Sequence, residues 1–216
     1  MGLLRVDVPV WTSAHSTPSA TPPKSTATKH PRETPSHRAA PIAFNGAMRP
    51  DLTAVPLRSE RLDLLPIAPE HAEELAAALA DPALHAFTGG RPATVEEMRA
   101  RCARLAAGSP DPAEAWGNWV LRLRADGALT GYVQATIRPA LAELAWVVGT
   151  PWQGRGLATE AARTLLAHLT AAGTPTAVAH IHPDHHASAA IARALGLHPT
   201  ADQNDGETRW QADLSR

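Results

Sequence analysis

The sequence predicts an α+β fold in which helices flank a mixed, mostly antiparallel sheet with a strand–helix–strand crossover at its centre. The apolar run Leu141–Val148 has the length of a buried strand and is followed by Gly149 and Pro151. Apolar residues then recur at helical spacing over residues 157–169, and TAVAHIH at residues 176–182 has the composition of another short strand. Alternating segments joined by short turns on both sides of this unit favour antiparallel hairpins.

The first strand and the first helix are predicted from adjacent segments. LRSERLDLLPI, residues 57–67, places Leu62 and Leu64 on the side expected to face the core. Residues 69–80 carry apolar residues at helical spacing, and Pro69 followed by glutamates suits a first helical turn. A strand followed by a helix is therefore expected to open the folded domain.

A second helix is predicted over residues 94–107. Thr94 and Glu97 have the spacing of a capping box, in which each side chain bonds the backbone of the other. Cys102 lies on the apolar stripe of this helix. We therefore expect Cys102 to be a buried, unreactive thiol.

The remaining elements are two hairpins and one helix. Residues 119–124 and 129–137 alternate about the turn at 125–127, which predicts a β-hairpin. A helix is expected over residues 186–195, ahead of a glycine. The last residues predict a second hairpin that turns at Asn204-Asp205-Gly206.

The first part of the chain differs in composition from the rest. Residues 1–50 are rich in Ser, Thr and Pro, and such a segment buries too little apolar surface to offset its ordering entropy. We expect a disordered extension over residues 1–50 and one folded domain over residues 51–216. The extension is either a basic tail that touches a partner or a dispensable segment, and Met48 is an alternative start.

Charge and composition exclude several classes of function. Residues 1–50 hold six basic and two acidic side chains, whereas residues 51–216 hold fourteen and nineteen, so the domain has no broad basic face for nucleic acid. The single cysteine rules out an intrachain disulfide, and no apolar run is long enough to span a membrane. We expect a cytoplasmic protein, monomeric or homodimeric, without nucleic-acid or membrane partners.

The segment between the central strand and its helix has the chemistry of a phosphate site. Glycines at positions 154 and 156 allow the backbone to approach a ligand closely. The first amides of the following helix have no partners within the helix, and the helix dipole places about half a positive charge there. The chain contains no Walker sequence, and Thr159 stands where the dinucleotide fingerprint needs its third glycine.

This segment resembles motif A of the GNAT acyl-CoA N-acyltransferases, Q/R-x-x-G-x-G/A, which is matched by Gln153, Gly156 and Ala158. LRSERLDLLPI is similar to the opening strand of the branch that includes ribosomal-protein N-terminal acetyltransferases. IHPDHHASAAIARALGLHPT resembles motif B of the same branch. The resemblance covers residues 57–214 and implies a sheet splayed between the central strand and the next one.

The resemblance also implies acetyl-CoA as co-substrate, with no metal. Its pantetheine arm would lie in the splay, and its diphosphate would bind the glycine turn. The residues expected to contact the cofactor are Val147, Val148, Gln153, Gly154, Arg155, Gly156, Leu157, Ala158, Thr159, His185 and Ser188.

The chemistry requires a group that takes a proton from the attacking amine and a donor for the departing thiolate. Glu143 is the carboxylate candidate for the base, or else a surface charge. The tyrosine that serves as acid in many relatives is replaced by Ala192, which leaves Ser188 as the candidate donor. His185 stands where motif B usually has asparagine, so it either contacts the cofactor or transfers a proton. Amides near Val147 and Val148 are candidates for stabilising the oxyanion.

Two rival hypotheses remain at this stage. The histidines at 180, 182, 185 and 186 with Asp184 could indicate zinc, although motif B already accounts for most of them. The domain could also be a non-catalytic acyl-CoA sensor or interaction module on the same fold. The acceptor is a primary amine, either a protein N-terminus or a small molecule, and the sequence does not choose between the two.

Overall fold

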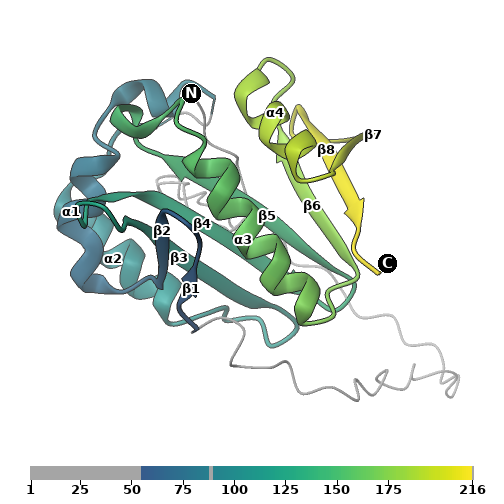
Figure 1. Cartoon of the computed structure of the whole chain (residues 1–216), viewed down its shortest axis with the longest axis horizontal. Coiled ribbons are helices and arrows are strands. Elements are labelled where there is room, and N and C mark those ends of the chain that lie inside the picture. The colour runs from purple at the N-terminus through teal and green to yellow at the C-terminus, as the bar shows by residue number, and fades with distance from the viewer. Residues whose placement is uncertain (1–54, 88–89, 216) are drawn as a thin grey trace, which may run out of the picture. The chain divides into compact units, whose positions relative to one another are not determined.

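A computed structural model of the protein describes residues 55–87 and 90–215. These residues form one eight-stranded sheet in the order β1-β2-β3-β4-β5-β6-β8-β7, flanked by helices (Figure 1). Within the described ranges, β5 and β6 are the one parallel pair. The predicted α+β class with a central crossover is confirmed, whereas the extension over residues 1–50 lies outside the described residues.

The elements before the crossover follow the predicted order. Their bounds are β1 Leu57–Arg58, β2 Leu62–Pro66, α1 Ala72–Ala78, α2 Val95–Ala106, β3 Ala115–Leu123 and β4 Leu129–Arg138. The predicted first strand is split in two, because the chain turns back at residues 59–61 and β1 pairs antiparallel with β2. The helix expected at residue 69 starts as a 3₁₀ turn, and the Thr94–Glu97 capping box of α2 is present.

The second half contains the crossover and a closing hairpin. Its elements are β5 Leu141–Val148, α3 Leu157–Ala171, β6 Thr176–Ile181, α4 His186–Ala194, β7 His198–Asn204 and β8 Glu207–Asp213. The crossover helix α3 ends with Gly173 in the left-handed conformation, at a φ of 83°, as expected for a residue just past a helix end.

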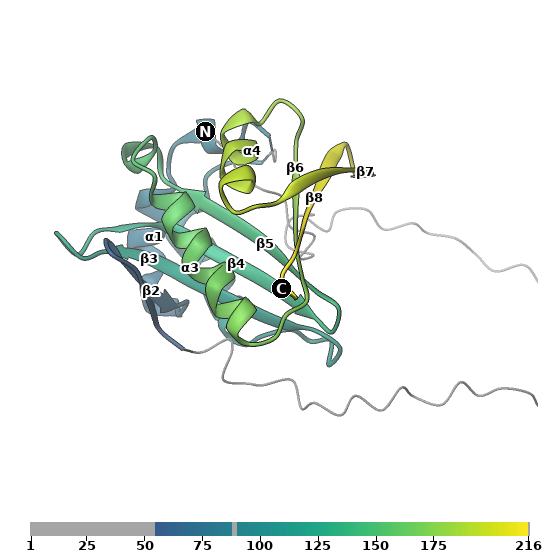
Figure 2. The same cartoon turned by 45° about the vertical axis from the view of Figure 1, so that its right-hand side comes forward.

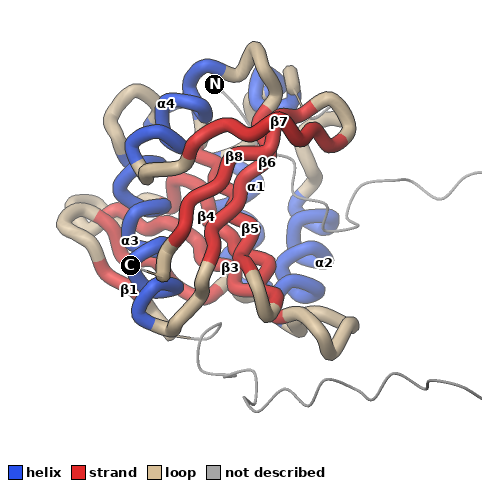
Figure 3. Tube along the Cα trace, turned by 90° about the vertical axis from the view of Figure 1, so that its right-hand side faces the viewer, coloured by secondary structure: helices blue, strands red, loops and turns tan. Residues whose placement is uncertain are grey.

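The two faces of the sheet carry different side chains. Cross-strand pairing places Trp119, Val133 and Trp146 on one face, where they pack in the core with the buried stripe of α3. The opposite face lies against α1 and α2, and α2 contacts it through a hydrogen bond from Arg101 to the Tyr132 hydroxyl at 2.8 Å. In Figure 3, the strands separate α3 from α2.

The sheet opens between β5 and β6. These strands pair only at Ala142–Ala177 and Glu143–Val178, at the beginning of β5. Beyond Glu143 they diverge, and β6, β8, β7 and α4 turn away from the rest of the sheet (Figure 2). The splay expected from the family resemblance is therefore present, and it lies where the glycine turn meets α3.

Leu165 offers a test of how strongly α3 is held to the sheet. Its side chain is 1% exposed within the core, so Leu165→Ala should lower the free energy of unfolding by about 2–5 kcal/mol. Ala167→Ser, on the exposed side of the same helix, should change it by about 0.5 kcal/mol or less. Urea denaturation measures both, and equal losses for the two variants would contradict this packing.

Candidate functional site

A cleft of about 230 Å³ opens where the sheet splays. Its walls are the end of β5, the glycine turn, the start of α3 and the start of α4. The residues that line it are Trp146, Val148, Trp152, Gln153, Gly154, Gly156, Leu157, Ala158, Thr159, His185, Ala187, Ser188 and Ile191. Nine of the residues expected to bind cofactor are thus brought together, whereas Val147 and Arg155 do not line the cleft.

The glycine turn presents unpaired amides to the cleft. Gly154 and Gly156 both adopt left-handed backbone, with φ of 72° and 76°, a conformation that other residues rarely accept. Gly156 precedes the first turn of α3, and no side chain caps that turn. The first helical N–H groups therefore remain available to an anion, and the helix dipole favours negative charge at this end.

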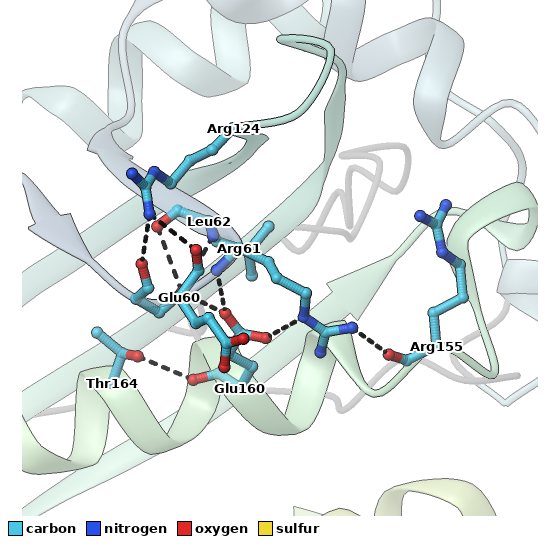
Figure 4. A network of polar contacts seen from close by, with 8 residues as sticks. Glu60, Arg61, Leu62, Arg124, Arg155, Glu160 and Thr164 are labelled. Carbon is cyan, nitrogen blue, oxygen red and sulfur yellow. Dashed lines mark hydrogen bonds and ion pairs between the residues drawn. The ribbon is translucent and has the colours of Figure 1, made fainter.

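Arg61, which directly precedes β2, supports the turn and does not line the cleft (Figure 4). The Arg61 guanidinium donates to a Glu160 carboxylate oxygen at 2.6 Å and to the Arg155 carbonyl at 2.9 Å. Since that carbonyl is bonded on the outer side, the Arg155 peptide is fixed in one orientation. The Arg155 side chain points away from this network (Figure 4).

Glu160 is the anchor of this network. Its carboxylate also accepts from the Ser59 hydroxyl at 2.6 Å and from the Arg61 backbone N–H at 2.8 Å. Burial opposes its ionisation, but these hydrogen bonds and the Arg61 charge outweigh burial, so the pKa of Glu160 lies below its usual range. Sequence reasoning missed Arg61 and Glu160, which lie 99 residues apart.

The edge of β5 that faces the gap carries free backbone groups. Gly149 N–H donates to the Thr130 carbonyl of the neighbouring strand. Because successive residues alternate in direction, the Val147 N–H also points to β4, whereas the Val148 N–H points into the gap. The Val148 carbonyl accepts from the Gln153 side-chain amide at 2.9 Å, which ties the strand end to the glycine turn.

His185 caps the first turn of α4. Its Nδ1 accepts from the Ser188 backbone N–H at 3.3 Å, and its Nε2 lies 3.1 Å from Ser188 Oγ. In the neutral ring an accepting Nδ1 requires the proton on Nε2, so His185 donates to the hydroxyl oxygen. The Ser188 O–H then remains to donate elsewhere, and both residues line the cleft. The histidine thus performs the capping task that an asparagine side chain performs at helix starts.

A segment from the other side of the sheet contacts His185. Phe87, which follows α1, stacks on the His185 ring with centroids 4.7 Å apart and an angle of 18° between the planes. The same phenyl ring lies 5.3 Å from the ring of His182. The α1–α2 connection therefore reaches across to the beginning of α4.

Glu143 lies on the opposite face of the sheet from Trp146 and away from Ser188. It sits at the closed end of the gap, 7% exposed, and pairs with Val178 of β6. His180 Nδ1 lies 2.8 Å from one carboxylate oxygen of Glu143, and Arg138 lies 3.6 Å from the other. The hydrogen bond to Glu143 raises the pKa of His180, against the effect of burial.

The position of the missing family tyrosine carries no hydroxyl group. Ala192, at that position, is fully buried, and Tyr132, the one tyrosine in the sequence, lies on the face of the sheet away from α3 and is bonded to Arg101. Among residues 55–87 and 90–215, no cluster of three potential metal ligands occurs. None of the helices in those ranges is long and apolar enough to cross a membrane.

Comparison with known proteins identifies the family. A family model described as an acetyltransferase (GNAT) domain matches residues 61–198. The structure is similar to that of a GNAT-family acetyltransferase from Bacillus anthracis, with 15% identity and a TM-score of 0.63 over 75% of this chain and 100% of that one. A search of curated proteins found no significant match.

Two further neighbours were solved with cofactor. The ribosomal-protein α-N-acetyltransferase RimL, in complex with coenzyme A, has 16% identity and a TM-score of 0.61 over 74% of this chain and 99% of that one. The microcin self-immunity acetyltransferase MccE, in complex with acetyl-CoA and AMP, has 17% identity and a TM-score of 0.58 over 76% and 99%. Since the family model spans well over half of the chain and these neighbours share its fold, this chain belongs to the GNAT family and is an acyltransferase.

Proposed function

We propose that this protein transfers an acetyl group from acetyl-CoA to a primary amine, by direct attack of the amine on the thioester. The observation that carries the proposal is the uncapped start of α3, whose free amides open into a cleft continuous with the splay between β5 and β6. Neighbours of the same fold hold coenzyme A or acetyl-CoA. The acceptor is a protein N-terminus or a small-molecule amine.

The glycine turn would bind the diphosphate of coenzyme A. Amides from Gly154 to Thr159 would donate to its oxygens, with the positive end of the α3 dipole behind them. The pantetheine arm would run back along the gap, where its amide groups can pair with the free backbone of β5, including the Val148 N–H. Arg155 is exposed at the rim, where it can meet a phosphate from outside the cleft.

The reacting carbonyl would lie towards the closed end of the gap, because the thioester sits at the far end of the arm from the diphosphate. Each residue of β5 spans about 3.3 Å, so a position several residues before Val148 approaches Glu143. A gap-facing N–H of β5 can donate to the oxyanion that forms there. The amine would approach from the face that carries Glu143, while the cofactor lies on the side of α3.

His180, oriented by Glu143, would take the proton from the amine. Its Nδ1–H donates to the carboxylate, which leaves Nε2 with a lone pair, and the charge of Glu143 stabilises the imidazolium that results. This pairing changes the role expected for Glu143 from direct base to orienting carboxylate. The amine then attacks the carbonyl carbon, and the carbon–sulfur bond breaks when the tetrahedral intermediate collapses.

Ser188 would stabilise the departing thiolate. His185 donates to Ser188 Oγ, so the serine O–H is directed to another acceptor, and the cleft is the space that it lines. A hydrogen bond to the thiolate lowers the cost of its departure, and solvent can supply the proton afterwards. In this role His185 orients the Ser188 hydroxyl and does not itself transfer a proton.

The proposed reaction is tested with purified protein, acetyl-CoA and a panel of primary amines and peptides. Release of free thiol that depends on the amine, together with an acetylated product of the correct mass, is the expected result. Saturable binding of acetyl-CoA with no turnover on any amine would overturn the proposed reaction.

Gly156→Val tests whether the glycine turn binds the diphosphate of coenzyme A. The left-handed backbone disfavours valine, whose Cβ would lie 3.6 Å from the Arg61 guanidinium that supports the turn. The turn and its free amides should therefore be displaced, and the affinity for coenzyme A should fall by about a hundredfold or more. Gly173→Val is the matched control, because it has a similar φ at the other end of α3 and an open surrounding. Isothermal titration should show normal coenzyme A affinity for the control variant. Unchanged affinity in Gly156→Val would contradict the placement.

Arg61→Met tests the support of the turn. Loss of the bonds to Glu160 and to the Arg155 carbonyl should raise the Michaelis constant for acetyl-CoA roughly two- to fivefold, a modest effect because the ion pair is partly exposed. The turnover number should stay the same. Arg58→Met, which breaks an exposed pair with Asp63 nearby, serves as the control. Equal kinetic constants in Arg61→Met and wild type would show that Arg61 does not support the glycine turn.

Glu143→Gln tests the proton acceptor. His180 must be neutral to act, and its pKa is raised, so kcat/KM should rise as the pH increases through that raised pKa. Removing the Glu143 charge should shift this rise to lower pH and reduce the plateau about tenfold or more, because the imidazolium loses its partner. The pH profiles of all variants are measured with the same amine, so its own protonation affects each profile equally and does not contribute to the differences between them. His198→Gln, an exposed histidine on β7, should leave the profile unchanged. An unchanged pH profile in Glu143→Gln would exclude the Glu143–His180 pair as the proton acceptor.

A further inference from the structure

Three polar side chains are buried without partners on the sheet face opposite α3. Asn118 and Gln134 are each 4% exposed, and Thr136 is 1% exposed. Within the described residues, both amide atoms of Asn118, Nε2 of Gln134 and Oγ1 of Thr136 have no hydrogen-bond partner. Buried polar groups are normally paired in folded proteins, so this concentration of unpaired groups requires an explanation.

The strand register gathers these groups into a strip that leads to the gap. Asn118 lies opposite Gln134, and Gln134 lies opposite Ala145 of β5, the strand that borders the gap. In the adjacent row, Thr136 lies opposite Glu143. Directly paired residues share a sheet face, with side chains about 4.5–5.5 Å apart at Cβ. The polar strip, defined as Asn118, Gln134 and Thr136, therefore ends beside the Glu143–His180 pair.

Other buried polar groups on this part of the sheet do have partners. The Tyr132 hydroxyl accepts from Arg101, and Trp116 Nε1 donates to Glu114 at 2.7 Å. The Thr130 hydroxyl donates to the Leu121 carbonyl at 3.2 Å. The fold thus satisfies polar groups around the strip, whereas the buried polar atoms of the strip itself have no partner within the protein. Among the described residues, the one further buried side-chain N or O atom without a partner is Trp146 Nε1, and Trp146 lines the cofactor cleft.

The chemistry of the strip specifies what it can bind. Asn118 offers a donor and an acceptor, Gln134 offers a donor, and Thr136 offers either. None of the three is charged, so the strip does not complement a polycation, which would require carboxylates. A plain alkyl chain would leave all of these groups unpaired, which a specific site avoids. An amide group, with one N–H and one C=O in a fixed plane, matches the set.

We propose that the polar strip is the acceptor subsite, and that the acceptor is an amine with an amide group a short distance from its nitrogen. The amide pairs with Asn118 and Gln134, and Thr136 binds nearer to the amine. The amine nitrogen then points past Ala145 into the gap, next to His180. This inference rests on the proposed function and narrows its acceptor class.

The experiment compares two acceptors, alanyl-alaninamide and hexylamine, in wild-type protein and in Asn118→Leu, Gln134→Met and Thr136→Val. Each acceptor is compared between variant and wild type, so differences in amine basicity cancel. For the dipeptide amide, kcat/KM should fall about tenfold or more in Asn118→Leu and Gln134→Met, since each loses bonds to the acceptor. For hexylamine it should stay the same or rise. Affinity for coenzyme A should not change.

Thr130→Val is the matched control. It also removes a buried polar group, but one that is already bonded within the protein, so it should lower the melting temperature without changing the preference between the two acceptors. Turnover of both acceptors by the wild-type protein, with a preference between the dipeptide amide and hexylamine that the three variants keep, would overturn the acceptor subsite but not the proposed function. That result would mean that the strip holds only buried water. No thiol release with any amine would overturn the proposed function as well.

Discussion

The arrangement of this domain depends on the short pairing between β5 and β6. Two residue pairs hold the strands together, and beyond Glu143 the gap-facing N–H and C=O groups of β5 have no neighbouring strand. A protein cannot leave such an edge buried and unsatisfied, so the gap must take up a ligand that can pair with a strand, or water. Coenzyme A fits this requirement because its arm carries amide groups and its diphosphate matches the free amides that begin α3.

Local sequence predicted the parts of the site that depend on local structure. The glycine turn, the strand before it and the helix after it are contiguous, so their pattern was sufficient to place Gly154, Gly156 and the start of α3. The capping box of α2 and both hairpins were predicted for the same reason. In each of these cases, the residues that determine the conformation lie within a few positions of one another.

Interactions between distant segments were not predicted. Arg61 and Glu160 meet only after the sheet has formed, and nothing in either segment alone indicates the other. Glu143 and His180 are 37 residues apart, and no local pattern indicates that the carboxylate would orient a histidine. The capping role of His185 is local, but a pattern that expects asparagine does not show that the imidazole Nδ1 can replace it. The polar strip depends on the register of three strands, which periodicity alone does not determine.

The sheet separates two tasks that usually constrain each other. Residues that would hold the cofactor project from the α3 side or from the glycine turn, whereas Asn118, Gln134 and Thr136 project from the other face. Substitutions of Asn118, Gln134 or Thr136 therefore contact neither the glycine turn that would bind the diphosphate nor the core beneath α3. Because of this partition, the residues on the acceptor side can change during evolution and accept new amines. The residues that bind acetyl-CoA can stay the same.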